Sequence, residues 1–258
     1  MQINSRKVPV SKMHDGNLTV AVDNLAIETV VNLHYNQEKI ASLLASPNDA
    51  KYLLLGHLIS EGYVTFDQLS GINIESVVIE NTTKGTDVYL TGDFSLAFES
   101  KATKITTTSC GACNNDGLQE LSDNLPINDY SIEFDDSILH IGMESMKSLQ
   151  KGFRLTGGMH SACLLSIDGS ILSFAEDIGR HNAVDKVIGK SVEYGLPNKQ
   201  ILLLSGRCGW DIVAKASRAG VPVIASIGAC SSLAADCARM LGIKIYSFVK
   251  PSSHTIIG

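Results

Sequence analysis

The feature that most constrains the fold is the regular alternation of short apolar runs with amphipathic segments after Met143. The runs predict strands over residues 160–167, 170–175, 200–204, 222–226 and 244–249. The Asp168-Gly169 pair between the first two predicts a hairpin turn. The amphipathic segments predict helices over residues 143–153, 182–194, 210–219 and 232–241. Strands that alternate with helices form a largely parallel sheet covered on both faces, and the continuous apolar runs are typical of such burial. We therefore expect an α/β core over residues 142–258.

Residues 25–141 have a less regular pattern, which indicates a smaller α+β part. Apolar runs predict strands over residues 25–33, 39–44, 72–79 and 87–90. A helix is expected over residues 50–61, with Asp49 as its N-cap and Gly62 as its end. Residues 118–141 are expected to hold a short helix and a polar link. Residues 1–24 are polar and weakly patterned, so we expect an irregular lead-in there.

Composition excludes several classes of protein. The 258 residues are 44% hydrophobic and 19% charged, a globular balance rather than a disordered one. A net charge of −6 without a basic block gives no support for nucleic-acid binding. The N-terminus lacks the apolar core of a signal peptide, and no apolar run is long enough to span a membrane. We expect a soluble, cytoplasmic protein whose 6 cysteines are thiols rather than disulfides.

The sharpest local motif is the pair Cys110 and Cys113, with Gly-Ala between them. Residues 103–117 around the pair carry few apolar side chains, so we expect an exposed, mobile loop. Two thiols at this spacing can react with each other, share a metal or pass on a sulfur atom. A zinc ion would need further ligands, because no second pair of this kind exists; the candidates are His160, Cys163 and His181. A thioredoxin-like role and two accidental surface thiols are less favoured.

A polar segment, residues 176–186, follows the strand expected to end at residue 175 and leads into a helix. Open α/β sheets bind ligands at the carboxyl ends of their strands, and a helix N-terminus can bind an anion. A capped, solvated helix start explains Asn182 and Lys186 but explains Arg180 and His181 poorly. We therefore favour a ligand site here.

Two glycine-bearing turns lie at other strand ends. Gly157 and Gly158 precede His160, and Ser205-Gly206 precede Arg207. Glycine lets backbone N–H groups approach a phosphate, and arginine can bind one bidentately. Together with residues 176–186, these turns would meet at one edge of the sheet and suit an anionic, nucleotide-like ligand.

The other four cysteines have simpler interpretations. Cys163 and Cys237 lie in apolar periodic segments and are expected to be buried packing residues. Cys208 and Cys230 lie at loop–helix junctions, where they are either structural or face the pocket.

These motifs resemble those of the formate dehydrogenase accessory proteins, the FdhD/NarQ family. The matching stretches cover residues 55–62, 109–113, 153–160, 176–189, 205–207, 215–223, 232–234 and 248–250. The resemblance spans about residues 25–250, which is nearly the whole chain. The chain departs from the usual family pattern at Asn114, Gly209, Asp211 and Cys230.

The resemblance implies a sulfurtransferase. It would receive persulfide sulfur from a cysteine desulfurase on Cys110, with Cys113 as helper or in the reverse order. It would deliver this sulfur to the molybdenum or tungsten of a Mo-bis(molybdopterin guanine dinucleotide) cofactor used by formate dehydrogenase. The resemblance also implies a homodimer and a three-layer α/β/α core similar to cytidine deaminases. No metal of its own is expected, because the zinc signatures of deaminases are absent.

The same resemblance implies that one C-terminal segment contributes to cofactor binding, namely Phe248, Val249, Lys250, Pro251, Ser252 and Ser253. The residues of the strand ends would bind the guanine dinucleotide moieties: Gly157, Gly158, His160, Asp177, Arg180, His181, Asn182 and Arg207. Two alternatives remain open, a cofactor-binding chaperone without sulfur transfer and a zinc-dependent, deaminase-like hydrolase.

Overall fold

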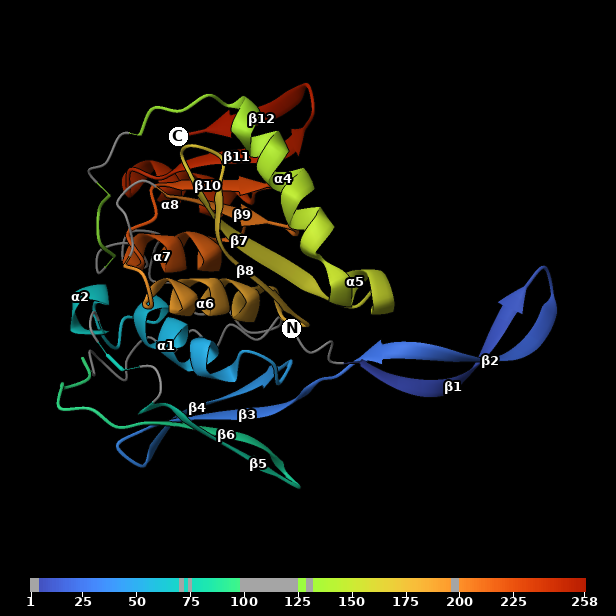
Figure 1. The fold of residues 1–258 in the computed structure, drawn as a ribbon. Coiled ribbons are helices and arrows are strands. Elements are labelled where there is room, and N and C mark those ends of the chain that lie inside the picture. Colours follow the sequence, from blue (N-terminus) through green and yellow to red (C-terminus); the bar gives the residue numbers. More distant parts are fainter. Residues whose placement is uncertain (1–4, 70–71, 74–75, 98–124, 129–131, 196–199) are drawn as a thin grey trace.

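The computed structural model describes residues 5–69, 72–73, 76–97, 125–128, 132–195 and 200–258. Within these ranges the strands form a 2-stranded, a 4-stranded and a 6-stranded sheet (Figure 1). Cys110, Cys113, the expected loop over residues 103–117 and the helix expected from residue 118 lie outside the described residues.

The 6-stranded sheet has the order β12-β11-β10-β9-β7-β8. Its strands are β7 (His160–Ser166), β8 (Ile171–Asp177), β9 (Gln200–Leu204), β10 (Val223–Ser226), β11 (Lys244–Lys250) and β12 (Ser253–Ile257). Only β9, β10 and β11 are parallel neighbours, whereas β7 is antiparallel to β8 and β9, and β12 is antiparallel to β11. The hairpin predicted for β7 and β8 is confirmed, but the expectation of a largely parallel sheet was wrong, because β7 is antiparallel to β9 and β12 adds a further antiparallel strand. A short turn can only return the chain antiparallel, and such turns join β7 to β8 and β11 to β12.

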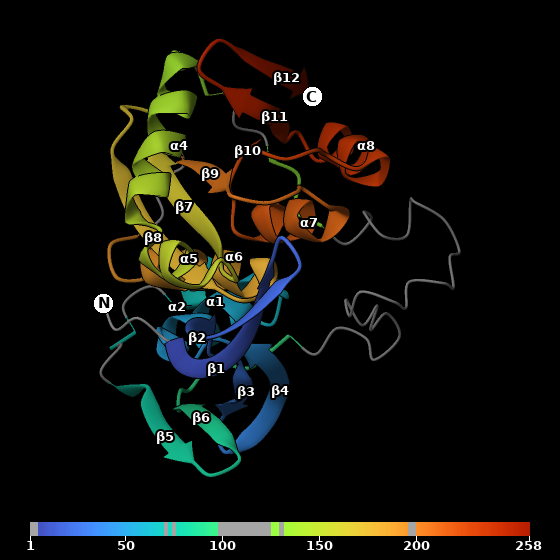
Figure 2. The same cartoon turned by 90° about the vertical axis from the view of Figure 1, so that its right-hand side faces the viewer.

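Helices cover both faces of this sheet (Figure 2). They are α4 (Ser137–Leu149), α5 (Lys151–Thr156), α6 (Arg180–Ser191), α7 (Trp210–Arg218) and α8 (Ser232–Met240). Helix α4 packs against Cys163, Leu165 and Leu203, while α6 and α7 share a cluster with the alternate residues Leu164 and Leu202. Successive side chains of a strand point to opposite faces, so each strand serves both layers. None of the described helices is long and apolar enough to cross a membrane.

The N-terminal part contains the 4-stranded sheet, in the order β4-β3-β6-β5. Its elements are β3 (Thr29–Tyr35), β4 (Glu38–Ala45), α1 (Ala50–Ser60), α2 (Phe66–Leu69), β5 (Val78–Thr82) and β6 (Gly85–Leu90). The strand expected from residue 72 begins only at Val78. Asp49 precedes α1 but makes no capping bond, because its carboxylate accepts from Lys190 Nζ at 2.7 Å. That capping prediction was wrong.

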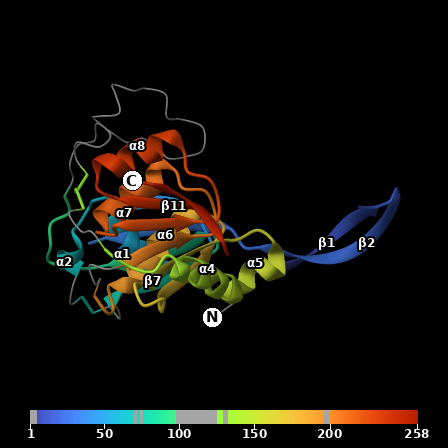
Figure 3. The ribbon, with the colours of Figure 1, turned by 90° about the horizontal axis from the view of Figure 1, so that it is seen from above.

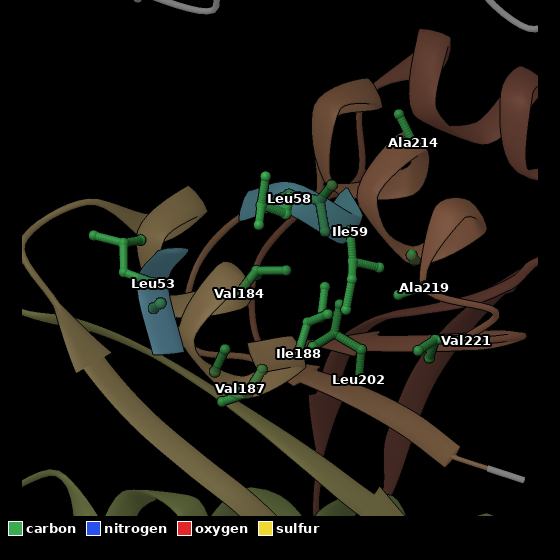
Figure 4. Packing of buried hydrophobic residues seen from close by; sticks show 14 of the residues in the cluster. Leu53, Leu58, Ile59, Val184, Val187, Ile188, Leu202, Ala214, Ala219 and Val221 are labelled. Carbon is green, nitrogen blue, oxygen red and sulfur yellow. The ribbon is translucent and has the colours of Figure 1, made fainter. Parts of the chain in front are cut away.

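Helices α1 and α6 touch through their backbones. A Cβ atom on Gly56 would overlap the Asp185 carbonyl oxygen, and one on Gly189 would overlap the Tyr52 carbonyl oxygen. Around this crossing, apolar side chains from both halves of the chain form one buried cluster, shown in Figure 4 for Leu53, Leu58, Ile59, Val184, Val187 and Ile188. The proposed boundary at residue 141 therefore divides the sequence without dividing this hydrophobic core.

Residues 5–26 form a β-hairpin, so the expectation of an irregular lead-in over residues 1–24 was wrong from residue 5 onward. Strands β1 (Ser5–His14) and β2 (Asn17–Ala26) pair along their whole length, and the ribbon projects from the body beside α5 (Figures 1 and 3). Asp15 and Gly16 both have positive φ, the requirement of the tightest hairpin turns. One face of the ribbon is apolar and exposed; it carries Met13, Leu18, Val20 and Val22.

Candidate functional site

The segments singled out in the sequence meet at one edge of the 6-stranded sheet. Strands β8, β9, β10 and β11 end there, and β7 begins there because it runs antiparallel to β9. Ser161 N donates to Ser205 Oγ at 2.8 Å, and Ser205 N donates to the Ser161 carbonyl at 3.0 Å. These bonds hold the turn after β9 against the start of β7, so His160 and Arg207 lie at the same edge, as the sequence predicts.

The turns that follow β9, β10 and β11 are bonded to one another. Ser226 Oγ donates to the Gly206 carbonyl and accepts from Gly228 N at 3.0 Å. Phe248 N donates to the Gly228 carbonyl at 3.1 Å. A Cβ atom on Gly228 would lie 3.1 Å from the Gly206 backbone, so a larger residue there would have to push the two turns apart. Glycine therefore permits a continuous backbone surface along this edge.

Positive charge gathers on that surface. Desolvation lowers the pKa of His160, and the positive charges of Arg180 and Arg207 lower it further. The Asp177 carboxylate acts in the opposite direction and raises this pKa. His160 and Arg207 are exposed, and the Arg180 side chain is 41% exposed. At neutral pH the site thus presents two guanidinium groups beside a neutral imidazole, an arrangement suited to an anion.

Asp211, in the first turn of α7, holds the side chains that follow β8. Its carboxylate lies 3.4 Å from Arg180 Nη2 and also contacts His181 Nε2. Burial lowers the pKa of His181, and the Asp211 carboxylate opposes that change. Asp211 on α7 therefore holds the Arg180 and His181 side chains, which belong to α6, at the site.

Asp177 and Asn182 lie beneath the surface rather than on it. Asp177 Oδ2 accepts from Lys186 Nζ at 2.6 Å and from Ser46 N at 3.0 Å, while Asp177 Oδ1 accepts from Gly179 N at 2.8 Å and Asn182 Nδ2 at 3.0 Å. Asn182 does not cap α6, because the helix begins at Arg180 and Gly179 occupies the N-cap position. These residues hold the turn that presents Arg180, so the structure gives them a positioning role.

Gly157 and Gly158 lead directly into His160. Gly157 has φ of 68° and ends α5, a position where glycine is favoured. Both Gly152 N and Phe153 N donate to the Glu176 carboxylate at 2.8 Å, which fixes the start of α5 against β8. The glycine pair is exposed next to the charged surface.

The C-terminal segment over residues 248–253 also reaches this edge. Phe248 is 48% exposed and has φ of 55°, a left-handed conformation that costs a non-glycine residue about 1–2 kcal/mol. Val249 is buried against the α4 face, and residues 250–253 are exposed. The segment therefore presents Phe248 and Lys250 outward while Val249 anchors it.

Two groups of residues near the site were not predicted to contact one another. Lys215 Nζ donates to Asp185 Oδ1 at 2.8 Å, Glu61 Oε1 at 2.6 Å and Ser60 Oγ at 2.9 Å, which links α7, α6 and α1. Burial raises the pKa of Asp185, but Lys215 and His57 lower it to about 2. The second group is a pair of thiols, Cys208 and Cys230, joined by a β-bridge.

Among the residues that the structure describes, no three His, Cys, Asp or Glu side chains are grouped as a metal site. Cys163, weighed above as a zinc ligand, is buried within the sheet, and burial raises its pKa to about 12.

Comparison with known proteins gives a consistent result. A model of the FdhD/NarQ family matches residues 26–257. The sulfur carrier protein FdhD of Sulfolobus acidocaldarius is 33% identical over 262 residues, covering 99% of this chain and 96% of the relative. The protein of the same name from Streptomyces coelicolor is 31% identical over 264 residues, covering 96% and 91%.

A solved structure has the same fold. The crystal structure of a protein assigned as a formate dehydrogenase accessory protein, from Desulfotalea psychrophila, matches with a TM-score of 0.73. The two chains are 22% identical, and the match covers 98% of this chain and 96% of the other. The mixed α/β architecture is therefore shared along nearly the whole length.

Proposed function

Because this chain belongs to the FdhD/NarQ family, we propose that it is a sulfurtransferase that relays persulfide sulfur. The sulfur would come from a cysteine desulfurase and go to the molybdenum or tungsten of a bis(molybdopterin guanine dinucleotide) cofactor required by formate dehydrogenase. Cys110 is the proposed carrier and Cys113 its helper, or the reverse. The proposal for these two residues rests on their motif and on family membership.

The structural observation that carries the cofactor-binding part of the proposal is the charged surface at the strand ends. Arg180, Arg207 and His160 lie together beside glycine-bearing turns, and Phe248 stands exposed next to them. Guanidinium groups bind phosphates bidentately, and an exposed aromatic ring can stack on a purine. A guanine dinucleotide offers both groups, so this surface suits the cofactor that the chain would sulfurate.

The thiol chemistry needs one accessible thiolate. The thiolate attacks the outer sulfur of the donor persulfide, a new S–S bond forms, and the desulfurase cysteine leaves as a thiolate. The cofactor metal is the acceptor of that sulfur and is a substrate of the protein. The pairing of Cys110 with Cys113 supports this role, because one thiol can carry the persulfide and the second thiol can then help to pass the sulfur on.

The proposal is tested by mass spectrometry after incubation with a cysteine desulfurase and cysteine. We expect the mass of one added sulfur atom on the peptide that holds Cys110 and Cys113, and its loss on reduction. Cys110→Ala and Cys113→Ala are each expected to lower the activity of the client formate dehydrogenase. Full client activity with both variants would contradict sulfur transfer.

A chaperone that binds the cofactor without moving sulfur remains the second candidate, since the charged surface supports it equally. The variant lacking both Cys110 and Cys113 separates the two functions. A chaperone would still support the client enzyme, whereas a sulfur carrier would not. No observation on the described residues favours the zinc-dependent hydrolase.

We further propose that the core is of the cytidine-deaminase type and that the protein is a cytoplasmic homodimer. The helices on both faces of the 6-stranded sheet support the first point. The exposed apolar face of the β1–β2 hairpin, where Val20 is 84% exposed, supports the dimer. A persulfide relay needs reduced thiols, which a cytoplasm maintains.

A further inference from the structure

Two thiols face each other across the turns that follow β9 and β10. Cys208 N donates to the Ala229 carbonyl at 3.0 Å, and Ser231 N donates to the Cys208 carbonyl at 3.1 Å. These two bonds make a parallel β-bridge between Cys208 and Cys230. The register that pairs Leu204 with Ser226 in the sheet thus continues past the strand ends to the two cysteines.

The bridge places the two residues at the separation that a disulfide requires. Directly paired residues on neighbouring strands have Cα atoms about 4.8 Å apart, with their side chains on the same face. Disulfides span Cα separations of about 4.4–6.8 Å. Each thiol also shifts the pKa of the other, as expected for side chains that lie next to each other. An S–S bond between Cys208 and Cys230 therefore needs little backbone movement.

The two thiols differ in exposure and in acidity. Cys208 is 1% exposed, whereas Cys230 is partly exposed. The hydrogen bond with Cys230, and then burial, raise the pKa of Cys208 well above its usual range; the charges of Cys230 and Asp211 add to this. The same hydrogen bond lowers the pKa of Cys230, burial opposes it, and Arg239 assists.

The position of Cys230 along the chain adds to this asymmetry. Cys230 directly precedes Ser231, the residue that caps α8 by accepting from Ala234 N at 3.2 Å. The positive end of a helix dipole stabilises a nearby thiolate. An accessible thiolate beside a buried thiol is the arrangement of a nucleophile and a resolving cysteine.

We propose that Cys230 and Cys208 form a redox-active dithiol site that reacts with the S–S bond of small-molecule disulfides. The Cys230 thiolate attacks one sulfur of the disulfide and releases the other half as a thiolate. The Cys208 thiol then attacks the Cys230 sulfur, gives up its proton and releases the second half. Two cysteine thiols are oxidised to one disulfide, and one small disulfide is reduced to two thiols. This site is independent of the proposed sulfur transfer on Cys110 and Cys113.

The product would join the turn that holds Arg207 to the turn that holds Gly228. Both turns belong to the charged surface described above, and Gly206 and Gly228 are already in backbone contact. The oxidation state of the pair therefore sets how far these two turns can separate.

The first test treats the full-length Cys110→Ser/Cys113→Ser variant with glutathione disulfide and maps the disulfides after proteolysis without reduction. We expect a linked peptide pair containing Cys208 and Cys230, which dithiothreitol separates. Cys237→Ala is the matched control, because Cys237 is a buried thiol on α8 and its loss should leave the link intact. Absence of the link in folded protein overturns the proposal.

The second test assigns the two roles. Cys208→Ser is expected to accumulate a mixed disulfide with glutathione on Cys230, whereas Cys230→Ser is expected to accumulate none on Cys208. A third measurement needs no substitution at either cysteine. In the protein that keeps both thiols, iodoacetamide at neutral pH should modify Cys230 at least roughly tenfold faster than Cys208. Faster modification of Cys208 would overturn the assignment.

Discussion

At the scale of single residues, the most consequential group is the ammonium of Lys186. It has no exposed surface, and it donates to Asp177 Oδ2 at 2.6 Å and to the Ser46 carbonyl at 2.9 Å. Burial lowers the pKa of Lys186, and the Asp177 carboxylate opposes that change. Through Asp177, which also binds Gly179 N, this buried pair holds the turn that carries Arg180. Lys186, which has no exposed surface, thus helps to fix Arg180 at the charged surface.

Replacing Lys186 is therefore expected to affect both stability and binding. Lys186→Met leaves the Asp177 carboxylate buried without its partner, and removing one member of a buried pair costs about 3–5 kcal/mol. Denaturant unfolding measures this loss. Lys190→Met is the matched control, since the pair of Lys190 with Asp49 is partly exposed and should contribute much less. Equal losses in the two variants would contradict the role assigned to Lys186.

His160 gives a prediction about pH. Its pKa in the folded protein is lowered, so at neutral pH it is uncharged. A bound phosphate would raise this pKa, and the protein would take up a proton on binding. Affinity for guanosine diphosphate should therefore rise as pH falls below about 6.5, the usual histidine value, until the free protein is also protonated.

The control separates histidine from the phosphate itself, which titrates in the same range. Titration calorimetry on His160→Gln should show binding with a flatter pH profile than the unchanged protein. The two profiles would coincide if His160 lies away from the ligand. The same lowered pKa means that folding stability decreases as pH falls through about 6.5, because the unfolded chain binds the proton more tightly.

Part of this site could be predicted from the charged and glycine residues that follow the expected strands. Arg180, His181, Arg207 and His160 come together because the sheet topology gathers strand ends, which alternating segments are sufficient to indicate. The sequence could not show that Asp177 and Asn182 turn inward, since that depends on Lys186 reaching back from the next helical turns. The pairing of Cys208 with Cys230 depends on strand register, which apolar patterns do not specify.

At the scale of elements, glycine decides how closely two helices pack. Gly56→Ala and Gly189→Ala each place a methyl group inside a carbonyl oxygen of the opposite helix. Overpacking of this kind costs about 1–3 kcal/mol or more, because the helices must move apart. We expect a lower thermal midpoint in both variants. Gly158→Ala is the control, because its Cβ would make only ordinary contacts; an equal loss there would argue against a tight crossing.

Element boundaries were predictable where glycine ends a helix. Gly62, Gly195, Gly220 and Gly242 all adopt positive φ just beyond predicted helices. The β1–β2 hairpin was missed although Asp15-Gly16 carries the signal that identified the turn at Asp168-Gly169. Its strands contain many polar residues, since most of the ribbon is exposed and only its base packs against α5. Strand β12 was missed because only two of its five residues, Ile256 and Ile257, are apolar, which is too few to show a strand pattern.

At the scale of the whole molecule, the β1–β2 hairpin projects from the body and packs against it through α5. A two-stranded ribbon is only marginally stable by itself in water, and this one exposes Leu18, Val20 and Val22 on one face. A second copy of the chain would cover that face in the proposed homodimer. The ribbon would then be stabilised by assembly rather than by the body of its own subunit.

Substitutions on the ribbon test this. Val20→Lys/Val22→Lys is expected to shift the protein from dimer to monomer in analytical ultracentrifugation, with the thermal midpoint of the body little changed. Thr19→Lys lies on the opposite face of the same strand and should leave the dimer intact. An assembly state that does not respond to the double substitution would exclude the hairpin from the interface.

The shared core has a consequence for synthesis on the ribosome. Helix α1 is complete by residue 60, but α6, against which it packs through Gly56 and Gly189, begins only at residue 180. More than a hundred residues must therefore be translated before α6 can complete the burial of the leucines of α1, namely Leu53, Leu54, Leu55 and Leu58. Contacts between such distant segments form slowly, and exposed apolar helices are ligands for chaperones. We therefore expect the nascent N-terminal half to need protection from aggregation until α6 has been translated.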